Sequence, residues 1–180
     1  YAASRVTADH FLSLLFSQKK INYSSVRSSN VYGEHQRLYR IVPKTIFFIL
    51  KKKKLNLHGG GTSKRNFIHI DDVSLATLKV MISGKNGECY HISGNNMISI
   101  RNLVKKICEK MNYNFNKLVK FSNERKGKDK TYSLSSKKIR TKLKWKQKIT
   151  LDKGLDRCIG WIKTNLKDFS DKDLEYTHKR

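Results

Sequence analysis

Three consecutive glycines at 59–61 separate two alternating apolar segments, and this pattern constrains the fold more than any other part of the sequence. A P-loop needs a Lys-Ser or Lys-Thr pair and a helix directly after its glycines, and a dinucleotide fingerprint needs a helix that opens on its third glycine. Residues 66–70 instead alternate as a strand does. The residues alone favour a glycine-rich hairpin between strands at 55–58 and 66–70, with Arg65 at its root able to hold a phosphate through two hydrogen bonds.

The composition indicates a folded chain with a strongly basic surface. Its 180 residues, 38% of them hydrophobic, suffice for one domain with a core. The net charge of +25 invites nucleic acid as a partner. Yet the lysines are spread along the chain, with one tight run at 51–54, and the aromatic residues are not interleaved with them as a stacking platform requires. We therefore do not expect nucleic acid as the partner, and a diphosphate or other polyanionic ligand fits the charge better.

Other sequence features argue against further classes of protein. The longest strongly apolar run, at 46–50, is far too short to span a bilayer, and no secretory signal is visible, so we expect no membrane partner. The three cysteines lie far apart without a CxxC spacing, which is typical of small buried side chains in a reducing, cytoplasmic compartment. The six histidines form no HExxH pattern, and we expect no metal.

Hydrophobic periodicity predicts short strands and helices of an α/β protein. Strands are expected at 21–28, 55–58, 66–70 and 88–94, with a loop at 29–36. Helices are expected at 1–18, from Pro43 through the lysine run, at 73–83 behind Asp71 or Asp72 as cap, behind Ser99, behind Ser135 or Ser136, and behind Thr150. The tail after 167 is polar and is expected to fray.

Several short motifs occur in an order that resembles a known family. They are YAASR at 1–5, RSSNVYG at 27–33, VP at 42–43, GGGTSKRNFIHIDDV at 59–73, ERKGKD at 124–129 and KIRTKLKWKQKITLDKGLDRCIGWI at 138–162. Together they resemble the C-terminal half of extended short-chain dehydrogenases/reductases, the NAD-dependent epimerase/dehydratase family, with the closest similarity to enzymes of the dTDP-glucose 4,6-dehydratase type.

The resemblance implies the C-terminal part of an NAD(P)-binding, Rossmann-type protein with a mixed α/β substrate-binding lobe. Residues 1–30 would be the end of the Rossmann domain. Residues 31–167 would be mostly the lobe, with elements returning to the Rossmann sheet, and 168–180 a polar tail. The parent would use NAD to oxidise a nucleoside diphosphate sugar at C4, eliminate water across C5–C6 and reduce C6, for deoxysugar and polysaccharide synthesis. It is expected to be a cytoplasmic homodimer.

Two other functions remain open on the sequence. A nucleotide-sugar epimerase or decarboxylase would share the fold, and a non-catalytic basic module that binds nucleic acid would belong to another class. The family's glycine-rich NAD fingerprint and its acidic pair lie upstream of the Tyr motif, and neither occurs in these 180 residues. The chain also begins at Tyr rather than Met, so we expect a fragment or processed product that binds NAD poorly and does not turn over alone.

The resemblance also implies site residues. Tyr1 and Arg5 match the family's Tyr-x-x-x-Lys pair, with Arg in place of Lys. Two residues four apart lie on the same side of a helix, so the cation lies near the Tyr hydroxyl and favours its phenolate form. The Tyr can then accept a proton during catalysis. Both, with Asn30, would also contact the cofactor. The substrate-binding positions would be Asn30, Arg40, Ile41, His58, Arg65, Asn96 and Arg125. Lys126 replaces a Pro of the family. Asp71 and Asp72 are expected to cap a helix rather than to act in catalysis.

Overall fold

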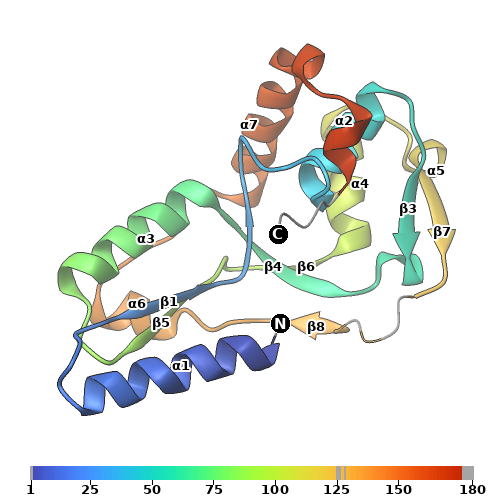
Figure 1. Ribbon diagram of the computed structural model, residues 1–180. Helices are drawn as coiled ribbons and strands as arrows, with labels where there is room; N and C mark the ends of the chain where they lie inside the picture. Colours follow the sequence, from blue (N-terminus) through green and yellow to red (C-terminus); the bar gives the residue numbers. More distant parts are fainter. Residues whose placement is uncertain (1, 125–126, 128, 176–180) are drawn as a thin grey trace.

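The computed structural model describes residues 2–124, 127 and 129–175, and the elements are labelled in Figure 1. Its α-helices are α1 (Ala2–Ser17), α2 (Ile41–Leu50), α3 (Ile70–Ser83), α4 (Ile100–Lys110), α5 (Phe115–Leu118), α6 (Lys137–Lys142) and α7 (Leu151–Thr164). Its strands are β1 (Ser25–Ser28), β2 (Asn30–Tyr32), β3 (Leu55–His58), β4 (Lys64–His69), β5 (Cys89–Ile92), β6 (Met97–Ser99), β7 (Val119–Ser122) and β8 (Thr131–Tyr132). Three short 3₁₀ turns complete the order: η1 (Gly59–Gly61), η2 (Leu166–Asp168) and η3 (Asp171–Leu174).

Most strand pairs are parallel, which confirms the predicted α/β class. β1 pairs with β5, and β3 pairs with β7, each in parallel. β4 is the centre of the third sheet, where it pairs in parallel with β2 and β8 and antiparallel with β6. Parallel neighbours need long crossover connections, and helices supply most of them here.

The buried apolar side chains form two clusters. The first, here called the lobe core, brings α2, α4 and α7 together with β3 and includes Phe47, Leu103 and Leu155. The second, here called the β5 core, packs α3 and α6 around β5 and includes Tyr90 and Trp145. Figure 1 shows the two groups of elements at opposite sides of the molecule, with β4 running between them.

Two helices begin at the capping residues that the sequence predicts. The Ser99 side chain accepts a hydrogen bond from the backbone N–H of Asn102 and begins α4. Thr150 does the same for α7 through the N–H of Lys153. Each satisfies one of the first N–H groups of a helix, which have no partner within it. The predicted helices at these positions are confirmed, as is the helix near the start of the chain.

The predicted glycine hairpin is wrong. β3 and β4 do not pair with each other; they belong to different sheets. Gly59, Gly60 and Gly61 take φ values of +55°, +63° and +68°, a left-handed conformation that residues with a side chain rarely adopt. This turn redirects the chain instead of folding it back, and Arg101 Nε holds it by donating to the Gly60 carbonyl at 2.8 Å.

Three further expectations were wrong. The loop predicted at 29–36 contains β2, because parallel pairing with β4 fixes it as a strand. Neither Asp71 nor Asp72 caps α3; the His69 side chain does so by accepting from the N–H of Asp71. The described part of the tail does not fray, since Phe169 packs with its ring 5.3 Å from that of Trp161 and 6.4 Å from that of Phe47.

Candidate functional site

A cleft of about 750 Å³ lies where β2, β4 and the beginning of α2 meet. Four of the predicted site residues line it: Asn30, Arg40, Ile41 and Arg65. The parallel register that sets Asn30 opposite Phe67 explains part of this grouping. Arg65 precedes Phe67 by two residues on β4, and side chains two apart on a strand point to the same face. Residues 35 positions apart in sequence thus share one cavity.

The cleft favours an anionic ligand. None of its described lining residues is acidic, whereas Arg40 and Arg65 both line it. Two helices also begin here, since Ile41 opens α2 and Ile100 opens α4. The N–H groups at a helix N-terminus carry partial positive charge, so both helix ends add to the field of the arginines.

Backbone contacts orient two of the polar side chains. Arg65 is half-buried and donates to the carbonyls of Lys64 and Asp129, each at 2.7 Å. The side chain of Asn30 donates to the Asn66 carbonyl at 3.3 Å. Arg40 is exposed, with its guanidinium 5.3 Å from the centre of the Tyr39 ring. Planar donor groups therefore lie on β2, on β4 and directly before α2, and such groups suit a phosphate or diphosphate.

Of the remaining predicted site residues, those that the structure describes do not line this cleft. His58 lies at the end of β3 with Nδ1 2.9 Å from the Ser122 hydroxyl. Asn96 is exposed and lines another cavity, of about 430 Å³, which shares only Phe67 with the cleft. Arg5 is exposed on α1. Tyr1 and Arg125 lie outside the described residues, so the predicted catalytic pair and the second phosphate-binding arginine stay predictions.

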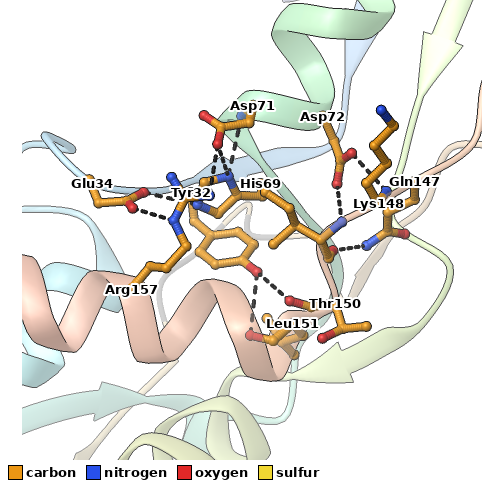
Figure 2. A network of polar contacts seen from close by, with 11 residues as sticks. Tyr32, Glu34, His69, Asp71, Asp72, Gln147, Lys148, Thr150, Leu151 and Arg157 are labelled. Atoms are coloured by element: carbon orange, nitrogen blue, oxygen red, sulfur yellow. Dashed lines mark hydrogen bonds and ion pairs between the residues drawn. The ribbon is translucent and has the colours of Figure 1, made fainter.

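Beside the cleft, the segment IHIDDV at 68–73 takes part in the polar network of Figure 2. His69 is fully buried; its Nδ1 accepts from the N–H of Asp71, which places the ring proton on Nε2, 3.0 Å from Glu34 Oε2. Arg157 of α7 donates to Glu34 at 2.5 Å and to Asp71 at 2.8 Å. The network therefore fastens α7 to the junction of β4 and α3.

Asp72 has a separate structural task. Its carboxylate accepts the backbone N–H groups of Lys148 and Ile149 at 2.8 and 2.9 Å and so fixes the approach to α7. These bonds are to a distant loop and not to the first turn of its own helix, as the expected cap would require.

Burial and neighbours set the protonation of this region. Burial alone would raise the pKa of Glu34, but its backbone hydrogen bond and the Arg157 guanidinium outweigh that effect and hold the pKa below the ordinary 4.5. Burial raises the pKa of the Tyr32 phenol far above 10.0. Tyr32 therefore acts as a donor, and its hydroxyl lies 3.4 Å from the Leu151 carbonyl. Both groups anchor α7.

Sequence reasoning missed two residues of the cleft. Ser29 and Ser63 line it, are only 5% and 3% exposed, and have hydroxyls without a hydrogen-bond partner in the described structure. A signal was present, because Ser63 precedes Arg65 by two residues and Ser29 directly precedes Asn30. Without the strand pairing, however, nothing distinguishes them from surface serines.

The cysteines and the described acidic and histidine side chains indicate no other chemistry. All three thiols are free, and burial raises the pKa of Cys108 to about 11 and of Cys158 to about 12, so both stay protonated. Within the described ranges, no three metal-ligating side chains gather as a metal site requires. No helix in the same ranges combines the length and apolarity that crossing a bilayer demands.

The fit of NAD to these residues is partial. A dinucleotide needs a strand–turn–helix unit whose glycines admit its pyrophosphate. Among the described elements, β4 and β6 run straight into α3 and α4 without a glycine between them. The loop from β2 to α2 contains one glycine, Gly33. The described residues therefore do not fit the pyrophosphate of NAD.

Comparison with known proteins is consistent with this geometry. The family model described as GDP-mannose 4,6 dehydratase matches residues 1–158. Human dTDP-D-glucose 4,6-dehydratase is 32% identical over 182 residues, covering 97% of this chain and 52% of the human protein. The chain thus spans about half the length of the curated relatives it matches.

Solved structures agree on the fold. DesIV, a dTDP-glucose 4,6-dehydratase from Streptomyces venezuelae determined with NAD and TYD bound, is 27% identical with a TM-score of 0.90, over 97% of this chain and 53% of its own. UDP-glucose 4-epimerase from Thermotoga maritima is 25% identical with a TM-score of 0.86, over 92% and 54%. With the family model covering most of its length, this chain belongs to the GDP-mannose 4,6 dehydratase family, within the extended short-chain dehydrogenases/reductases.

Proposed function

We propose that this chain forms the nucleotide-sugar-binding half of an NAD-dependent nucleotide-sugar 4,6-dehydratase of the dTDP-glucose type. The observation that carries the proposal is the single cleft that contains Asn30, Arg40, Ile41 and Arg65. The resemblance in sequence predicts these same four positions, and human dTDP-D-glucose 4,6-dehydratase is among the most similar relatives.

In this proposal Arg65 and Arg40 neutralise the diphosphate, and the N-termini of α2 and α4 add to their attraction. Ile41 supplies apolar contact, and Asn30 orients the sugar beside the nicotinamide. Arg125 would also contact the diphosphate, His58 and Asn96 would contact the nucleotide, and Tyr1 with Arg5 would serve the C4 hydroxyl. The other half of the longer parent would hold most of NAD.

The assembly and location of the parent are part of the same proposal. A homodimer in the cytoplasm is expected, with residues 1–30 ending a Rossmann domain and 31–167 forming most of the lobe. The buried residues of both hydrophobic clusters lie within 31–167, and in this proposal the β5 core, which contains α3, belongs to the elements that return to the Rossmann sheet.

Titration calorimetry with dTDP tests the proposal on the 180-residue chain. Arg65→Ala should weaken dTDP binding by roughly 10- to 100-fold, since hydrogen bonds to charged groups are among the strongest in proteins. Lys64→Ala is the matched control: it removes one positive charge from the neighbouring residue, which does not line the cleft. Equal losses from both variants would show that only net charge matters, and the proposed site would be wrong.

Two competing functions give different results. A basic nucleic-acid module would retain single-stranded DNA at physiological salt, with an affinity that falls steeply as salt rises, and would bind dTDP no better than phosphate. The similarity to UDP-glucose 4-epimerase makes an epimerase the second alternative function. That alternative differs in the acidic residues of the other half, so the sequence of the full parent decides it.

A further inference from the structure

Ser29 and Ser63 are unusual among the buried polar residues of this chain. Most of the others bond to the backbone or to another side chain; Ser136, for example, accepts from Arg140 Nε at 3.0 Å. A buried hydroxyl without a partner loses its hydrogen bonds to water and destabilises the folded state. Two such hydroxyls in the wall of one cleft, next to its arginine and its asparagine, point to a role in binding rather than in folding.

The backbone holds both serines in place. The N–H of Ser29 donates to the Ile92 carbonyl at 2.9 Å, and the carbonyl of Ser63 accepts from the N–H of Ile100 at 3.0 Å. Their positions are therefore fixed by β5 and by the first residue of α4. Groups fixed before the ligand arrives lose little conformational entropy on binding.

Their spacing suits an extended ligand. The register sets Asn30 opposite Phe67, so Ser29 lies one residue before this pair and Ser63 four residues before it. At roughly 3.3 Å per residue, this difference places the two serines about 10 Å apart along the strands. Ser63 lies beside Arg65 and the N-terminus of α4, whereas Ser29 lies beside Asn30.

We propose that the Ser63 hydroxyl binds the diphosphate and that the Ser29 hydroxyl binds the sugar of a nucleoside diphosphate sugar. The inference rests on the proposed function and adds two specificity-determining residues to it. The cationic end of the cleft explains the first assignment, and the neutral amide neighbour explains the second. Each serine thereby gains in the complex the hydrogen bond that it lacks within the described protein.

The test compares two probes, dTDP and dTDP-glucose, by calorimetry on the full chain. Ser63→Ala should weaken both about 10-fold or more, because a hydrogen bond to a charged diphosphate is stronger than one between neutral groups. Ser29→Ala should weaken dTDP-glucose about 3- to 10-fold, the value of one neutral hydrogen bond, and leave dTDP unchanged. An equal loss of both probes in Ser29→Ala would overturn its assignment to the sugar, and unchanged affinities in both variants would overturn the inference as a whole.

Thermal unfolding without ligand separates binding from folding. Both substitutions should raise Tm, because alanine removes a buried hydroxyl that has no partner. Ser136→Ala is the matched control, since its hydroxyl is bonded and lies outside the cleft; it should lower Tm and leave both affinities unchanged. A lower Tm together with weaker binding in Ser29→Ala and Ser63→Ala would indicate a structural role and contradict the inference.

The outcomes also separate this inference from the function on which it rests. If Arg65→Ala weakens dTDP binding while both serine variants bind normally, the inference fails and the proposed function stands. If the unsubstituted chain binds neither probe, both fail.

Discussion

The lobe core and the region around β5 differ in how completely they cover their apolar side chains. In the lobe, α2, α4 and α7 surround aromatic and aliphatic residues that are almost fully buried. On the other side, large apolar side chains of α1, β1 and α3 remain exposed. They are Val6, Phe11, Leu14, Val26, Ile70, Leu75, Leu78, Met81 and Ile82. Several large apolar side chains exposed on these three elements are expected where further protein packs, which supports the proposal that α1 and β1 end a Rossmann domain of a longer parent, to which α3 returns.

The comparison also locates the candidate site. The proposed ligand-binding residues of the cleft lie on or directly before β2 and β4 and at the N-termini of α2 and α4, which are elements that border the lobe core. In this proposal the diphosphate is held without contacts from α1. The contacts that depend on α1, above all those predicted for Arg5, lie in the region with the exposed apolar surface.

The largest difference in stability between the two regions is expected when one phenylalanine of each is replaced by alanine. Phe47→Ala should destabilise the chain by about 3–5 kcal/mol, because it opens a cavity in the lobe core where Phe47 is 1% exposed. Phe11→Ala, on α1 with 59% exposure, should change stability by less than about 0.5 kcal/mol. Urea unfolding measures both, and similar losses would show that the two regions do not differ as described.

Two glycines of α7 allow a test of how this helix packs against Tyr32 and His69. A Cβ at Gly154 would clash with the Tyr32 hydroxyl and lie 2.9 Å from His69 Cδ2. Gly154→Ala should therefore cost about 1–3 kcal/mol, as overpacking does. Nothing lies within 4 Å of a Cβ at Gly160, so Gly160→Ala on the same helix should stabilise by up to about 1 kcal/mol. Thermal unfolding of the two variants should give Tm shifts of opposite sign; shifts of the same sign would contradict the packing.

A smaller effect is expected from the ion pairs that join α7 to β4 and α3. The pKa of Glu34 is lower in the folded chain than its ordinary 4.5. Its contribution to stability is therefore fully present above about pH 4.5 and is lost as the pH falls through the folded pKa. Glu34→Gln should destabilise by about 1 kcal/mol at neutral pH, because a hydrogen bond to a charged group is weakened and Arg157 is partly exposed to water.

The pH dependence provides the control for this prediction. The difference in unfolding free energy between Glu34→Gln and the unsubstituted chain should shrink as the pH falls below about 4.5. A difference that stays constant between neutral and acidic pH would mean that the charge of Glu34 does not act in this network.

The sequence predicted best the elements whose information is local. Ser99 and Thr150 precede helices with one clear apolar stripe, and both helices begin where the caps predict. The resemblance predicts Arg40 and Arg65 as substrate-binding residues; both line one cleft, and their role in binding stays a prediction. The errors concern contacts over long distances in sequence. Pairing partners of β2 and β3, the Asp72 bonds to residues 148 and 149, and the packing of Phe169 all depend on neighbours that no local window contains.

The same reason explains why the sequence does not predict Ser29 and Ser63 as residues of the cleft. Their residue type is common on surfaces, and only the meeting of β2, β4 and α4 buries them. A buried hydroxyl without a partner is visible only in three dimensions.

The most direct test of the account is a titration of the ¹⁵N-labelled chain with dTDP-glucose, followed by backbone amide chemical shifts. The shifts should concentrate at residues 29–31 and 63–67 and at the first turns of α2 and α4, with further shifts at the predicted contacts Arg5, His58 and Asn96 and little change on α3. Shifts confined to the separate cavity at 95–98 and 147–152, or no saturable shifts at all, would contradict the central claim that the cleft between β2 and β4 is the nucleotide-sugar site.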